Sequence, residues 1–69
     1  MYTATRGDYE IGRASLFNLV DEVVNGLAKF YPGDEVVVKD DSDRQVCRIV
    51  FEVGGCVQVV PEVADFNQL

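Results

Sequence analysis

Carboxylates are the side chains of this sequence that could most readily do chemistry, because it has 12 Asp and Glu residues against 6 Lys and Arg and no His, a formal net charge of −6. Neighbouring carboxylates can exchange protons, hold a cation or attract a basic protein surface. The ones that we single out form clusters along the chain. They are Asp21, Glu22, Asp34, Glu35, Asp40, Asp41 and Asp43.

Catalysis is not the use that we predict for these carboxylates. A chain without His lacks the most versatile general base near neutral pH, and neither a Ser-His-Asp nor a Cys-His arrangement can form. The glycine pair Gly54-Gly55 lacks the Lys and the helix that follow a phosphate-binding loop. Because a domain this small also seldom forms a cleft of ligand size, we predict a protein that is not an enzyme and uses no cofactor.

The acidic run at residues 40–43 invites comparison with a calcium-binding loop. If Asp41 takes position 1 of an EF-hand loop, Asp43 and Glu52 fall at positions 3 and 12. Position 6 must be Gly but is Val46, and the stretch has the pattern of a strand. The sequence therefore predicts no metal site here.

The two cysteines, Cys47 and Cys56, predict neither a metal site nor a disulfide. Their spacing does not suit zinc, and no His can complete a site. We place them about 20 Å of strand apart, whereas a disulfide needs Cα atoms within about 7 Å. We therefore interpret both as small apolar residues in or near a sheet.

The acidic balance indicates which partners are favoured. The six basic residues are scattered, so the chain should repel nucleic-acid phosphates and anionic membranes. No apolar run approaches the roughly 20 residues of a membrane span and no signal peptide is visible, which predicts a cytoplasmic protein. The favoured partner is a protein with a basic surface, with no direct binding of nucleic acid.

One amphipathic helix is predicted over residues 15–30, with Ser15 as its N-cap. On a wheel of about 100° per residue, every apolar residue falls on one half, which we expect to be buried. That half contains Leu16, Phe17, Leu19, Val20, Val23, Val24, Leu27, Ala28 and Phe30. Residues 31–34, Tyr-Pro-Gly-Asp, then fit a type II turn.

Three strands are predicted after this turn, at residues 35–39, 44–53 and 56–60. The last two form a hairpin with two candidate registers. A two-residue loop, Gly54-Gly55, would place Gln58 on the apolar face. A three-residue loop, Gly54-Gly55-Cys56, pairs Phe51 with Val59 and keeps Gln58 on the polar face, so we favour it.

These elements predict an α+β fold, a single domain over residues 1–69 with the helix packed on an antiparallel sheet. The expected order is a candidate N-terminal strand, the helix and three strands, so the sheet has three strands or four. Residues 1–12 are open between strand and arm, and residues 62–69 between docking turn and loose tail. Because one helix covers one face, we expect some apolar valine surface on the other.

The leading hypothesis for function is a small acidic, non-enzymatic protein that inhibits or regulates a larger protein by stoichiometric binding. Its seven carboxylates would imitate phosphates and occupy a nucleic-acid-binding groove of that partner. Phage-encoded inhibitors of host defence include such small acidic proteins, an analogy of composition alone. The alternative is an assembly subunit that forms a homodimer or a larger oligomer through its exposed sheet face or edge. The simplest explanation of the charge is a solvated surface that keeps the protein soluble.

Overall fold

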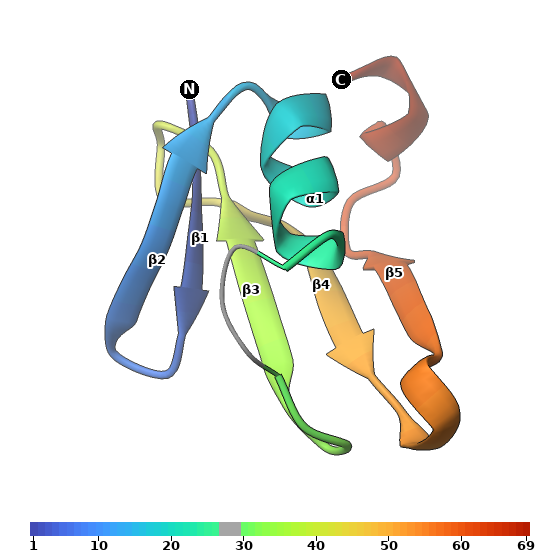
Figure 1. Cartoon of the computed structure of the whole chain (residues 1–69). Helices are drawn as coiled ribbons and strands as arrows, with labels where there is room; N and C mark the ends of the chain where they lie inside the picture. The colour runs from blue at the N-terminus through green and yellow to red at the C-terminus, as the bar shows by residue number, and fades with distance from the viewer. Residues whose placement is uncertain (27–29) are drawn as a thin grey trace.

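Five strands form one antiparallel sheet in the computed structural model, which describes residues 1–26 and 30–69. The strands are β1 (Tyr2–Arg6), β2 (Tyr9–Ala14), β3 (Glu35–Lys39), β4 (Gln45–Phe51) and β5 (Val57–Pro61). Their order across the sheet is β2-β1-β3-β4-β5, and the helix α1 (Leu16–Val24) lies over one face (Figure 1). The predicted α+β class, with a helix on an antiparallel sheet, is confirmed.

The N-terminal segment supplies two strands, so the sheet has five strands where the sequence predicted three or four. β1 and β2 form a hairpin that turns at Gly7, whose φ of +62° suits glycine. β1 also pairs with β3, with Ala4 opposite Val38. The sequence left residues 1–12 ambiguous because β1 also pairs with β3, whose residues lie more than 30 positions away in the chain.

The helix is shorter than predicted. It ends at Val24, and Gly26 follows with a φ of +102°, the left-handed conformation in which glycine commonly terminates helices. Phe30 is not helical, and its ring stacks on Phe51 with centroids 4.1 Å apart. The predicted helical residues Leu27, Ala28 and Lys29 lie outside the described residues. Beyond them, the type II turn is confirmed, since Asp34 N–H donates to the carbonyl of Tyr31 and Gly33, at the third position, has a φ of +94°.

The core lies between α1 and the sheet. In the register of β3 with β4, Val36 faces Ile49 and Val38 faces Cys47, so alternate residues of both strands point towards the helix. The buried apolar residues are Ala4, Leu16, Leu19, Val23, Val36, Val38, Val46, Cys47 and Ile49. Among the described residues of the predicted buried helix half, Phe17 and Val24 are instead exposed, by 84% and 41%.

The hairpin between β4 and β5 differs from the predicted register. Phe51 pairs with Val57, and Glu52 N–H donates to the carbonyl of Cys56, which leaves Val53-Gly54-Gly55 as the three-residue loop. The favoured pairing of Phe51 with Val59 was therefore wrong. The predicted assignment of residues to the two sheet faces was correct, because Val57 and Val59 lie on the same face as Phe51 and Ile49. The glycines adopt φ values of +84° and +78°, which places the tight turn one residue earlier than expected.

The C-terminal residues 62–69 dock on the domain rather than hanging loose. Glu62 N–H donates to the carbonyl of Val46, and a short 3₁₀ turn, η2 (Phe66–Gln68), follows. Phe66 packs against the core. In Figure 1 this segment lies above β5, beside α1.

Replacing Leu19 with Ala should lower the free energy of unfolding by about 2–5 kcal/mol, because this fully buried side chain leaves a cavity. The change is measured as a shift of the urea unfolding midpoint. Phe17→Ala on the same helix is the control and should change stability by no more than about 0.5 kcal/mol. An equal loss in both variants would contradict the observed orientation of α1.

Candidate functional site

The seven predicted carboxylates do not form one surface. Asp34 and Glu35 lie where β3 begins, whereas Asp40 follows its end, about 17 Å of strand away. Asp21 and Glu22 lie on the exposed side of α1, in the other layer of the fold. An array that imitates a continuous run of phosphates would need these clusters side by side, and the structure separates them into three groups.

Five of the seven carboxylates are ion-paired within the chain. The pairs are Asp34 with Arg6 at 3.6 Å, Glu35 with Arg48 at 3.3 Å, Asp40 with Arg44 at 3.1 Å, Asp41 with the N-terminal ammonium at 2.8 Å, and Asp43 with Lys39 at 3.6 Å. Exposed ion pairs of this kind contribute little stability. They do lower the negative potential that these carboxylates present to a partner.

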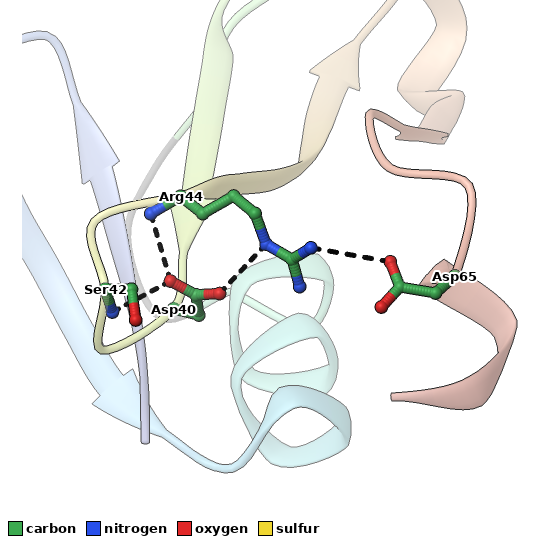
Figure 2. Close-up of polar contacts among 4 residues, drawn as sticks. All are labelled: Asp40, Ser42, Arg44 and Asp65. Atoms are coloured by element: carbon green, nitrogen blue, oxygen red, sulfur yellow. Dashed lines mark hydrogen bonds and ion pairs between the residues drawn. The ribbon is translucent and has the colours of Figure 1, made fainter.

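Asp40 has a structural role in the turn between β3 and β4 (Figure 2). Its carboxylate accepts the backbone N–H of Ser42 at 2.9 Å and of Arg44 at 3.0 Å, and the Nε–H of Arg44 at 3.1 Å. The backbone hydrogen bond from Arg44 is the main cause that holds the pKa of Asp40 below its usual value. The Arg44 guanidinium also reaches Asp65 at 3.7 Å, so the turn is tied to the C-terminal segment.

Asp21 and Glu22 are the predicted carboxylates without an ion pair in the described part of the chain. Asp21 accepts a hydrogen bond from the neutral Asn25 side chain at 2.7 Å, so no cation within the described residues compensates its charge. Asp21 lies one helical turn after Phe17, so the two side chains are neighbours on the surface of α1. Glu22 lies about 140° around the helix from Phe17, on the other flank of the buried stripe.

An apolar groove of about 300 Å³ lies beside Phe17. It runs between α1, β5 and the docked C-terminal segment, and Val59 and Leu69 are partly exposed along it. Its lining residues are Leu16, Phe17, Val20, Val59, Phe66, Asn67 and Leu69. This surface was not predicted from the sequence, because the helical pattern placed Phe17 in the core. The available signal was the helical wheel, where Phe17 and Val24 lie at one edge of an apolar half too wide for a single contact with a sheet.

The sheet face opposite α1 is more polar than predicted. The alternating register places Val37, Val50 and Val60 there, all only half-buried. Arg48 crosses this face with ion pairs to both Glu35 and Glu62. This network interrupts the valine surface that the sequence had suggested for association.

Within residues 1–26 and 30–69, no group of three or more His, Cys, Asp or Glu side chains is arranged to hold a metal ion. In the same part of the chain, no helix is long and apolar enough to cross a membrane. Cys47 and Cys56 are both free thiols.

No protein family, curated protein or solved structure matches this chain.

Asp40→Asn should destabilise the turn at neutral pH, because a neutral amide is a weaker hydrogen-bond acceptor than the carboxylate. The lowered folded pKa means that ionised Asp40 contributes its stability above the unfolded pKa of 3.8 and loses it as the pH falls through the folded pKa. The stability difference from the wild type should therefore shrink in acid, as measured by urea unfolding across pH. Asp8→Asn is the exposed control, and a pH-independent difference for Asp40→Asn would contradict this role.

The two thiols should react at very different rates with a colorimetric thiol reagent at mildly alkaline pH. Burial, with a smaller contribution from Glu62, raises the pKa of Cys47 to about 11, whereas Cys56 is exposed. We expect one rapid equivalent that disappears in Cys56→Ser, and a second only after unfolding. Two rapid equivalents from the folded protein would show that Cys47 is accessible.

Proposed function

We propose that this protein is a non-catalytic binding domain that inhibits or regulates a larger protein with a basic surface. The observation that carries the proposal is the exposure of Phe17, whose ring is 84% accessible at the rim of an apolar groove. Burying such a side chain is worth about 1.5–3 kcal/mol, which a small domain with a thin stability margin leaves unused. Exposed apolar patches rimmed by polar residues are typical of protein interaction sites.

The charge of the protein supports a basic partner, but through fewer carboxylates than the sequence suggested. Asp21 is the predicted carboxylate that lies beside the groove without an ion pair in the described chain. The net charge of −6 would speed the approach of a basic protein, and the apolar groove would hold it. In this proposal Phe17 is the anchor and Asp21 gives selectivity for basic partners. The five ion-paired carboxylates contribute mainly to the negative electrostatic potential around the protein; they are Asp34, Glu35, Asp40, Asp41 and Asp43.

Affinity capture with the tagged protein from a lysate of its source organism tests this function. Partners captured by the wild type at about 50 mM salt should bind Phe17→Ser at least about tenfold more weakly, because aromatic anchors dominate interface energies. Tyr9→Ser is the matched control, since Tyr9 is an aromatic residue exposed by 71% in β2, at the opposite edge of the sheet from β5. Asp21→Lys should also weaken capture, and Asp8→Lys is its charge control.

Two results would contradict the proposal. Equal loss in Phe17→Ser and Tyr9→Ser would place the contact away from the groove. Recovery of the protein alone, as an oligomer that persists at about 500 mM salt, would favour the assembly subunit.

A further inference from the structure

We propose that the partner binds as an extended segment that pairs with the free edge of β5 and adds a strand to the sheet. This inference rests on the proposed function and specifies how the groove is used. β5 is the last strand of the sheet, and within the described residues no other strand covers its outer side. In strand addition, main-chain hydrogen bonds hold the segment and alternate side chains give the specificity.

The two edges of the sheet differ in their protection. β2 has a bulge opposite Ala4 and Thr5, and it carries Glu10 and Arg13, both of which protect an edge from pairing. β5 pairs with β4 in an unbroken register from Val57 to Pro61 and contains no charged residue. Only Pro61, at its last position, opposes pairing. β5 is therefore the edge that is left available for a further strand.

The groove lies where an added strand would need it. Val59 of β5 lines the groove together with Phe17 and Val20 of α1 and with Phe66. Side chains alternate between the two faces of a strand, so every second residue of a segment paired with β5 would lie on the helix side. An apolar residue at those positions would contact Val59 and Phe17. The intervening residues would lie on the opposite face, next to Gln58.

The charges around this edge favour a basic segment over a second copy of the protein. Asp21 neighbours Phe17, and Glu52 follows the end of β4, opposite Cys56, the residue before β5. Neither has an ion pair in the described residues. Arg48, which lies opposite Val60 of β5, and Arg44, which precedes β4, are already paired with carboxylates. A second copy would bring the same uncompensated negative charges to the edge. A segment that alternates apolar with Lys or Arg residues would complement them.

A random peptide library displayed on phage, selected on the wild-type protein, provides the probe. We expect enrichment of basic peptides with apolar residues at every second position. A synthetic copy of the enriched peptide should bind Gln58→Lys at least about tenfold more weakly and Gln58→Glu more tightly, because the substituted side chain lies beside the added strand. Tyr9→Lys on β2 is the matched control and should bind normally. Hydrogen exchange should show protection of the β5 amides on binding.

Each other outcome overturns a defined part of this inference. The library could instead yield peptides with apolar residues every three or four positions, whose binding is weakened by Phe17→Ser but not by Gln58→Lys. This result would mean that a helix fills the groove, so strand addition would be wrong while the binding function stands. A library without any binder sensitive to either variant contradicts both proposals. A salt-resistant dimer in sedimentation that Gln58→Lys dissociates would show that a second copy occupies the edge.

Discussion

A short helix has to cover a sheet that is wider than itself, and the remaining features of this structure depend on that mismatch. A nine-residue helix is about 14 Å long and about 10 Å in diameter, whereas five strands span roughly 19 Å. The buried residues beneath α1 come from β1, β3 and β4, whereas β5, at the edge of the sheet, contributes none of them. The docked C-terminal segment, through Phe66, covers part of the remaining apolar surface. The groove is the part that neither element fills.

The distribution of charge distinguishes carboxylates that are paired within the chain from those that would be available to a partner under the proposed function. Asp40 organises a turn, and the Glu35–Arg48–Glu62 network joins β3, β4 and the residue after β5 on the face opposite the helix. These contacts use the charge of the chain internally, so a high count of acidic residues does not translate into an equally acidic surface. Under the proposed function, the carboxylates without an ion pair would matter more to a partner than the net charge. Among the described residues, Asp21 neighbours Phe17 at the groove, and Glu52 lies opposite Cys56, the residue before β5.

The two edges of the sheet differ in how readily they could pair with another strand, and the groove lies beside the edge that is more available. A bulge and two charged residues make β2 a poor template for pairing, whereas β5 is regular and uncharged. A small domain with both edges open would aggregate, and one with both closed could not use its sheet for recognition. One protected edge and one open edge, the latter beside an exposed aromatic residue, are the arrangement expected of a domain that binds one extended partner.

Local sequence patterns determined much of this fold. The apolar periodicity predicted the helix and its core residues Leu19 and Val23. The residue pattern of the second half predicted strands β3 to β5, and Pro32-Gly33 predicted the turn that precedes β3. These predictions succeeded because the interactions that produce them lie within a few residues of each other. The pairing of β1 with β3, the ion pair of Asp41 with the N-terminus, and the exposure of Phe17 were decided only by tertiary structure. Each depends on which distant segment occupies the space beside a residue. The helical wheel placed Phe17 at the edge of the apolar half, but only the tertiary structure decided whether another segment covers it.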